Sequence, residues 1–199
     1  MQTRFGSDDE RYRYARPADI DAIVEMLADE EVGQWLWFVP ATPAFVRGYF
    51  QPLVDGQWQA LADGRPPSVA VFIVEDGDGA FLGQGAVVEV EGSAGGYEIG
   101  FQLPKSSWGR GIGTRLAEFL VAWAVHEHGA HRLQAGCLSG NAGSRKILEK
   151  VGLTLEGTRP GYRLKGDVRH DECEYGVRVE ELDAAHLQAL AERNRIGED

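Results

Sequence analysis

The sequence is poor in basic residues relative to acidic ones. Its 199 residues include 20 Lys and Arg against 31 Asp and Glu, so the formal net charge is −11 with histidine neutral. We expect no nucleic-acid partner, because an acidic surface lacks the counterion release that drives binding to phosphate backbones. The same field attracts small cationic partners such as amines.

Cysteine and long apolar runs are also scarce. The two cysteines, Cys137 and Cys173, are too few for a disulfide framework and favour a reducing compartment. The first ten residues carry acids where a secretory signal needs an apolar run, and the purest apolar stretch, Val69 to Val74, is too short to cross a bilayer. We therefore expect a cytoplasmic protein with no membrane partner.

The length and composition are typical of one folded domain. Domains commonly have roughly 100–200 residues, and one of this size buries roughly 70% of its surface without needing disulfides or metal. Hydrophobic residues at 43% and charged residues at 26% are ordinary values and exclude disorder over most of the length. We expect residues 1–199 to form a single domain, with a core at about 14–179 and a helical tail at about 183–192.

Hydrophobic periodicity predicts an α+β fold. Expected strands lie at 11–15, 68–75, 81–91, 97–103 and 131–138, with two more near 153–156 and 172–179. Expected helices lie at 18–31, 42–49, 109–126, 142–151 and 183–192. Pro52 should kink or divide the second helix. A strand, helix, strand unit within an otherwise antiparallel order predicts one local parallel pair, and hence a mixed sheet.

A glycine-alternating segment joins an expected strand to an expected helix. It consists of Trp108, Gly109, Arg110, Gly111, Ile112, Gly113 and Thr114. Residues without a Cβ let main-chain N–H groups converge, and the helix N-terminus adds partial positive charge. A pyrophosphate fits such a turn. A tight strand-to-helix turn with no ligand has the same sequence features, so both interpretations stay open here.

Two familiar phosphate-binding patterns are absent. In the dinucleotide pattern G-x-G-x-x-G, the last position is Thr114 when counted from Gly109 and Leu116 when counted from Gly111. The phosphate loop of nucleoside triphosphatases needs Gly-Lys followed by Ser or Thr, and this tripeptide does not occur in the chain. A nucleotide-binding protein is therefore kept only as an alternative.

A second motif supports the pyrophosphate interpretation. Residues 141–153 read Asn-Ala-Gly-Ser-Arg-Lys-Ile-Leu-Glu-Lys-Val-Gly-Leu. With the glycine turn they resemble the GNAT acetyltransferase superfamily, whose loop reads Gln/Arg-x-x-Gly-x-Gly/Ala and whose next helix often begins Asn-x-x-Ser and ends Lys-x-Gly-Phe. The Trp-Gly-Arg-Gly turn and residues 156–171 resemble its RimJ/RimL-like branch of ribosomal-protein N-terminal acetyltransferases. Trp108 replaces the usual Gln or Arg, and Leu153 replaces Phe.

The resemblance covers about Tyr14 to Val177 and implies the GNAT fold. In that fold a mixed, mostly antiparallel twisted sheet is flanked by helices, with a V-shaped splay between the fourth and fifth expected strands, 97–103 and 131–138. The pantetheine arm of acetyl-CoA would lie in the splay. Main-chain groups of Phe101, Gln102 and Leu103 would bind its amides, and the turn at 108–114 would bind its pyrophosphate. Asn141 either caps a helix or contacts the cofactor, and no metal is expected.

The implied reaction is direct transfer of an acetyl group to a primary amine. The amine must be neutral to attack, and its usual pKa is roughly 7.7–8.0 for an α-amine and about 10.4 for lysine. Glu98 is our candidate base, although an exposed or paired strand glutamate would look the same. Ser144 would protonate the departing thiolate, or else serves only the first turn of its helix. Tyr162, expected in a loop bordering the site, is an alternative proton donor.

Several points stay open at this level. The acceptor is a small molecule, such as a polyamine or amino sugar, or a protein N-terminus. The acyl group is acetyl or a longer one such as succinyl. A regulatory module that binds acyl-CoA without turnover is the rival interpretation, and family habit alone suggests a homodimer. The aromatic cluster at residues 35–38 with Tyr49 and Phe50 either packs in the core or covers the acceptor pocket.

Overall fold

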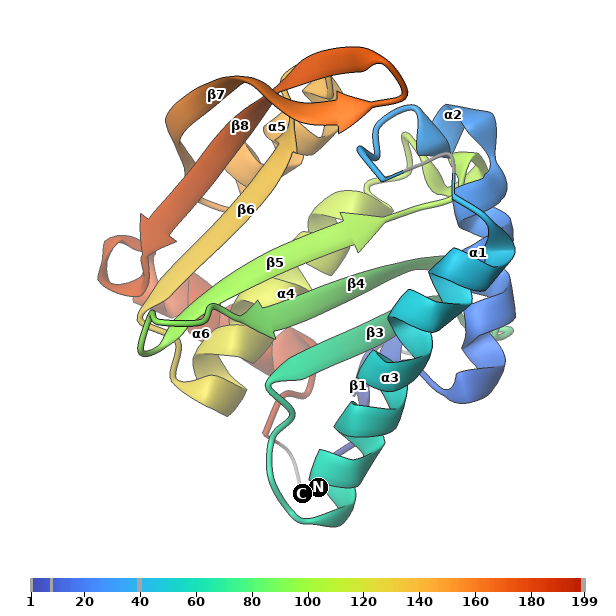
Figure 1. The fold of residues 1–199 in the computed structure, drawn as a ribbon. Helices are drawn as coiled ribbons and strands as arrows, with labels where there is room; N and C mark the ends of the chain where they lie inside the picture. The colour runs from blue at the N-terminus through green and yellow to red at the C-terminus, as the bar shows by residue number, and fades with distance from the viewer. Residues whose placement is uncertain (1, 8, 39–40, 198–199) are drawn as a thin grey trace.

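The computed structural model describes residues 2–7, 9–38 and 41–197. Within them, eight strands form one sheet in the order β1-β2-β3-β4-β5-β6-β8-β7, with helices on both faces (Figure 1). The strands are β1 Arg4–Gly6, β2 Glu10–Tyr14, β3 Val69–Asp76, β4 Phe81–Glu89, β5 Gly96–Gln102, β6 Arg132–Leu138, β7 Thr154–Lys165 and β8 Val168–Arg178. The helices are α1 Ile20–Ala28, α2 Glu30–Gly33, α3 Pro43–Ala62, α4 Ile112–His128, α5 Ala142–Lys150 and α6 Ala184–Arg193. The predicted α+β class is confirmed.

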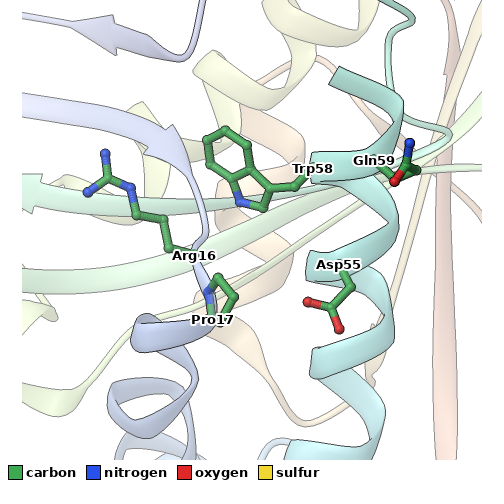
Figure 2. Close-up of a pocket in the computed structure, with 5 residues that line it drawn as sticks. All are labelled: Arg16, Pro17, Asp55, Trp58 and Gln59. Carbon is green, nitrogen blue, oxygen red and sulfur yellow. The ribbon is translucent and has the colours of Figure 1, made fainter. Parts of the chain in front are cut away.

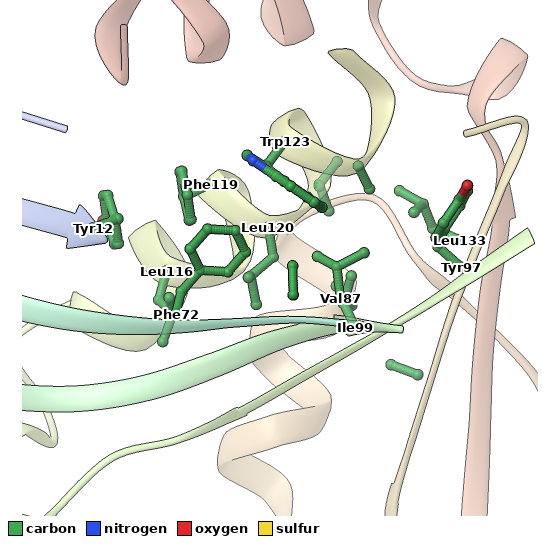
Figure 3. Packing of buried hydrophobic residues seen from close by; sticks show 14 of the residues in the cluster. Tyr12, Phe72, Val87, Tyr97, Ile99, Leu116, Phe119, Leu120, Trp123 and Leu133 are labelled. Atoms are coloured by element: carbon green, nitrogen blue, oxygen red, sulfur yellow. The ribbon is translucent and has the colours of Figure 1, made fainter. Parts of the chain in front are cut away.

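Strand β3 explains why the purest apolar stretch of the sequence is not a membrane segment. Its residues alternate between two cores: Phe72 and Val74 pack with α4, whereas Val71 and Ile73 pack with α1 and α3. A strand covered on both faces has a continuous apolar sequence. Figure 3 shows the α4 side of this packing, where the helix contributes the buried side chains of Leu116, Phe119, Leu120 and Trp123.

The predicted splay lies between β5 and β6. Among the described strands these two are the one parallel pair, and they are paired only at Gly96–Arg132, Tyr97–Leu133 and Glu98–Gln134. Beyond Glu98 and Gln134 they diverge, as Figure 1 shows. The sheet therefore opens on the side of the C-terminal ends of both strands.

Helix α3 continues through Pro52, contrary to the expected kink or division. Proline has no N–H and cannot donate to the carbonyl of Gly48. Both residues are exposed, so water can bind that carbonyl, while Phe50 and Val54 on the opposite side are buried against β3. Packing of the buried face therefore holds the helix together across the proline.

The helix predicted at 18–31 is interrupted at Asp29. This residue is extended, with φ −66° and ψ 126°, and its carboxylate accepts hydrogen bonds from the N–H groups of Glu31 at 2.8 Å and Val32 at 3.2 Å. Aspartate at such a position caps a new helix. The segment thus forms α1 and then the short helix α2, which turns the following aromatic segment toward the sheet.

The hairpin of β7 and β8 is far longer than the strands predicted near 153–156 and 172–179. Tyr162 consequently lies inside β7 and not in a loop, as we had expected. Most β7 side chains are exposed at the edge of the sheet. The strand therefore lacks the apolar alternation by which sequence analysis finds strands. The three-residue strand β1 was also not predicted.

Candidate active site

A cleft of about 660 Å³ lies where β5 and β6 separate. Its walls include residues from strands β4 to β8, from the start of α5 and from residues 35–38, which follow α2. Five of the predicted site residues line it, namely Glu98, Phe101, Gln102, Asn141 and Ser144. Leu103, Tyr162 and the turn at 108–114 are not among its lining residues.

The glycine turn presents a row of free main-chain donors. Gly109 and Gly111 have φ values of 71° and 77°, and no side chain caps α4. Among the described residues, no acceptor is recorded for the N–H groups of residues 109 to 114, and the first bonded amide is that of Arg115, which donates to Gly111 at 3.1 Å. Such a concave set of amides at a helix N-terminus is suited to an anion.

The third glycine of the turn has a packing role. A Cβ on Gly113 would lie 2.8 Å from Ile147 Cδ1 and 3.2 Å from Leu103 Cδ1. Gly113 therefore permits the close approach of α4 to α5 and to the end of β5. Only Gly109 and Gly111 are required by their backbone conformation.

Trp108 closes the turn instead of offering a free amide. Its main-chain N–H donates to Lys105 at 3.0 Å, and its indole N–H donates to the carbonyl of Leu103 at 2.9 Å. We expected main-chain groups of Trp108 to bind the pyrophosphate and those of Leu103 to bind the pantetheine amides; the N–H of Trp108 and the carbonyl of Leu103 are instead already hydrogen-bonded within the chain. The free amides begin at Gly109.

Phe101 and Gln102 lie on the open edge of β5. They pair with Gly85 and Gln84 of β4 on one side, but β6 has already diverged on the other. Main-chain groups that point toward β6 here have no strand partner, and such groups need one. This edge is suited to an extended ligand that carries amides.

Glu98 stands at the vertex of the splay and projects into the cleft. Tyr97 and Ile99 are buried against α4, which settles the alternation of the strand, since Glu98 faces the opposite side and is exposed. Its Oε2 accepts a hydrogen bond from Gln134 Nε2 at 3.3 Å. No Lys or Arg neutralises Glu98 among the described residues.

Ser144 and Asn141 lie together at the start of α5. Asn141 Oδ1 accepts a hydrogen bond from the N–H of Ser144 at 3.0 Å, so Asn141 is the N-cap of α5. The Ser144 hydroxyl interacts with the thiol of Cys137 in the cleft wall. Burial raises the pKa of that thiol to about 11, although the hydrogen bond from Ser144 opposes the shift. Ser144 thus lies beside the cleft, and its role as a proton donor stays a prediction.

Tyr162 is a support for two arginines. Its side chain is 49% exposed, and the guanidinium groups of Arg159 and Arg163 lie 4.7 and 5.0 Å from its ring centroid. Cation–π contacts of this kind orient guanidinium groups. Since its ring does not line the cleft, Tyr162 is a weaker candidate than Ser144 for a proton donor.

Five charged residues of the hairpin line the cleft and were not predicted as site residues from the sequence: Glu156, Arg159, Arg163, Glu172 and Glu174. Arg163 Nε and Nη2 donate to Glu172 Oε1 at 2.7 and 2.6 Å, and Arg159 pairs with Glu174. Glu172 is buried, with 4% of its surface exposed. The alternation of Glu172 and Glu174 with Cys173 and Tyr175 was a usable signal, because it places both carboxylates on one face of a strand.

The aromatic cluster, residues 35–38 with Tyr49 and Phe50, forms the wall that faces the β7–β8 hairpin. Of its rings, Phe50 is buried in the core, whereas Trp37 and Tyr49 are 46% and 58% exposed. All three line the cleft, and Arg163 lies 4.6 Å from the Trp37 ring centroid. Core packing therefore holds for Phe50, while a covering role over an acceptor stays a prediction for Trp37 and Tyr49.

No group of three or more His, Cys, Asp or Glu side chains in the described residues is arranged to hold a metal. No described helix is long and apolar enough to span a membrane. A second, more open hollow lies between α3 and the segment before α1, as Figure 2 shows, and contains no predicted site residue; it is lined by Arg16, Pro17, Asp55, Trp58 and Gln59.

Comparison with known proteins agrees with this geometry. The family described as "Acetyltransferase (GNAT) domain" matches residues 11–154. Bacillus subtilis YdaF, a putative ribosomal N-acetyltransferase, is 24% identical over 83% of this chain and 88% of its own length. Probable N-acetyltransferase YjcK of the same organism is 39% identical over 34% of this chain, and that alignment spans only 38% of YjcK.

Solved structures support the same fold. Mycobacterium smegmatis RimJ, solved in complex with CoA-disulfide, has a TM-score of 0.73 and 23% identity over 96% of this chain and 94% of its own. The predicted enzyme class, an acyltransferase that uses acetyl-CoA, is confirmed by the family match. The chain belongs to the GNAT acetyltransferase family.

Proposed function

We propose that this protein transfers the acetyl group of acetyl-CoA directly to a primary amine in the cleft between β5 and β6. The observation that carries the proposal is the row of unbonded amides at 109–114 together with the open edge of β5. The amides at 109–114 bind a diphosphate, and the open edge of β5 binds an extended chain that carries amides. We further propose that the chain works in the cytoplasm.

The amides of Gly109 to Thr114 bind the diphosphate, and the N-terminus of α4 adds partial positive charge there. The β5 edge at Phe101 and Gln102 aligns the pantetheine arm. An N–H on this edge then polarises the thioester carbonyl, because a fixed dipole stabilises the oxyanion that develops during attack. Gly100 has no atom within 4 Å of a Cβ position, so the space in front of β5 is free for the acyl group.

Glu98 accepts the proton of the attacking amine, directly or through water. The new C–N bond forms as the C–S bond breaks, and the Ser144 hydroxyl gives a proton to the departing sulfur. The proton taken up by Glu98 then returns through water to the Ser144 oxygen. No Lys or Arg among the described residues pairs with Glu98, so no cation occupies its carboxylate oxygens on the cleft side. Ser144 is held for its role by the Asn141 cap.

The test combines binding with turnover. Thermal melts with CoA, NAD and ATP identify the ligand, since only a ligand of the folded state raises Tm. Thiol release from acetyl-CoA is then followed with three acceptors: a peptide with a free N-terminal alanine, spermidine and glucosamine. We expect protection by CoA and release with at least one amine.

Two variants separate chemistry from binding. Glu98→Gln and Ser144→Ala should bind CoA like the wild type but lower kcat by about 10²–10⁴-fold, the usual contribution of acid–base catalysis. Binding of CoA with no thiol release by any acceptor would favour the regulatory module, and faster release from succinyl-CoA would change the acyl group. Protection by NAD or ATP instead of CoA would refute the proposal.

A further inference from the structure

Glu172 is a buried carboxylate with only one of its two oxygens occupied. Oε1 accepts both hydrogen bonds from Arg163. Oε2 is fully buried and has no hydrogen-bond partner among the described residues; its nearest cation, Arg159 Nη1, is 3.8 Å away. A buried carboxylate oxygen with no donor is costly, so a native structure that keeps one needs a reason for it.

Glu172 lies in the wall of the cleft between β5 and β6. Its carboxylate lies over Gly136, where a Cβ would stand 3.2 Å from Oε1. Gly136 is two residues beyond Gln134, the last β6 residue paired with β5, and so lies beside the open part of the splay. The absence of a side chain at Gly136 lets the carboxylate lie close against β6. Glu98, by contrast, lies at the closed vertex.

The charges around Glu172 are balanced. Arg163 neutralises Glu172, and Arg159 neutralises Glu174 on the same face of β8. A carboxylate compensated in this way accepts a hydrogen bond from an amine without strongly favouring the ammonium form, because nearby charges of both signs offset each other in shifting a pKa. Such a site suits a nucleophile that must be neutral when it attacks.

We propose that Glu172 binds the acceptor amine, with Oε2 accepting a hydrogen bond from the amine N–H. Arg163 is the positioning residue, because it fixes the carboxylate through Oε1 and is itself held over the Trp37 ring. A second unpartnered buried oxygen in the cleft, Gln84 Oε1, also points to a ligand rich in N–H donors. This assignment rests on the proposed function and adds the residue that recognises the acceptor.

The test is Glu172→Gln, which keeps the shape of the side chain and an oxygen for Arg163 but replaces the free acceptor by an N–H donor. Steady-state kinetics use whichever of the N-terminal alanine peptide, spermidine and glucosamine has the highest kcat/KM with the wild type. We expect KM for the amine to rise about 10- to 100-fold, the effect of losing one hydrogen bond to a charged group. The Kd for CoA and kcat should change less than about threefold.

Glu118→Gln is the matched control. Glu118 also pairs with an arginine, Arg193 at 2.8 Å, but lies on α4 away from the cleft. Its KM for the amine should equal that of the wild type. If Glu172→Gln does not fold, Glu172→Asp retains the charge, withdraws the oxygens by one methylene and should also raise KM.

The outcomes separate two failures. Turnover with an unchanged KM in both Glu172 variants would overturn this assignment and leave the proposed function intact. Equal losses of CoA affinity and amine affinity would indicate a general structural role and would also overturn it. No turnover by the wild type with any acceptor would refute the proposed function, and this assignment with it.

Discussion

Substitution of Gly109 by alanine tests the anion-binding turn most directly. Gly109 has φ 71°, and an added Cβ would meet no atom within 4 Å, so the cost of Gly109→Ala comes from the backbone conformation alone. An L-residue in the left-handed region costs about 1–2 kcal/mol. Within the described parts of the chain, no main-chain N–H of residues 109–114 donates a hydrogen bond. The side chains hold the turn only through the bonds from the Arg110 guanidinium to the Ser106 carbonyl at 3.4 Å and from the Arg115 guanidinium to the Arg110 carbonyl at 3.3 Å. We therefore expect the turn to relax when no ligand is bound.

Binding of CoA must then restore the strained conformation. The strain of about 1–2 kcal/mol is lost from the binding free energy, which weakens CoA binding about 5- to 30-fold. Calorimetric titration measures this loss. Pantetheine, which lacks the diphosphate, should bind the variant and the wild type equally.

Gly64→Ala is a closely matched control. Gly64 has φ 70° and equally open surroundings, but its N–H donates to Leu61 at 3.1 Å and the next amide, that of Arg65, donates to Ala60 at 2.9 Å. These hydrogen bonds keep position 64 in the left-handed conformation whether or not CoA is bound, so the strain destabilises the folded protein itself. The Tm should therefore fall by about 2–8 °C while CoA affinity stays unchanged. Wild-type CoA affinity in Gly109→Ala, or an equal loss toward pantetheine, would refute the reasoning.

Three further predictions concern groups away from the turn. Burial lowers the pKa of His128, which lies between the rings of Tyr97 and Trp123. The folded state thus binds fewer protons than the unfolded state, and stability should fall as pH drops below about 6.5; urea melts of His128→Phe should show a weaker loss from pH 7 to 5. With a pKa of about 11, the Cys137 thiol should react with iodoacetamide at pH 8 roughly 200-fold more slowly than a free thiol, as mass spectrometry can measure. Arg13 pairs with the largely buried carboxylates of Asp19 at 2.7 Å and Glu75 at 2.8 Å. Arg13→Met leaves both without their cation and should lower the free energy of unfolding, measured in urea, by about 3 kcal/mol; a loss under 1 kcal/mol would contradict this.

Elements with strong local signals were predictable from the sequence. The apolar run of β3, the stripe of α4 and the Asn141 cap each follow from a pattern within one segment. The predictions that failed, for Pro52 and for the length of β7, share one cause: each depended on contacts outside its own segment. Whether Pro52 divides a helix depends on which face the rest of the chain covers, and the length of β7 depends on its pairing with β8.

Within the candidate site, the turn at 109–114 could be found from the sequence, whereas the surroundings of Glu172 could not. The glycine turn is contiguous, so its residues appear together in the sequence. The contacts of Glu172 join three separate segments: its own strand, Arg163 on the neighbouring strand and Gly136 on β6. No local pattern brings these together. The indole of Trp108 bonding Leu103 is another contact that only the folded chain reveals.

The short seam between β5 and β6 divides the sheet into a five-stranded half and a three-stranded half. Three residue pairs join them, so the angle between the halves depends chiefly on the helices that bridge them from behind. A slight rotation about this seam changes the width of the gap least near Gly100, where we place the acyl group, and most at its far end. Substitutions in α4 or α5 that touch neither substrate can therefore alter the fit of the proposed pantetheine arm while leaving the space for the acyl group nearly unchanged.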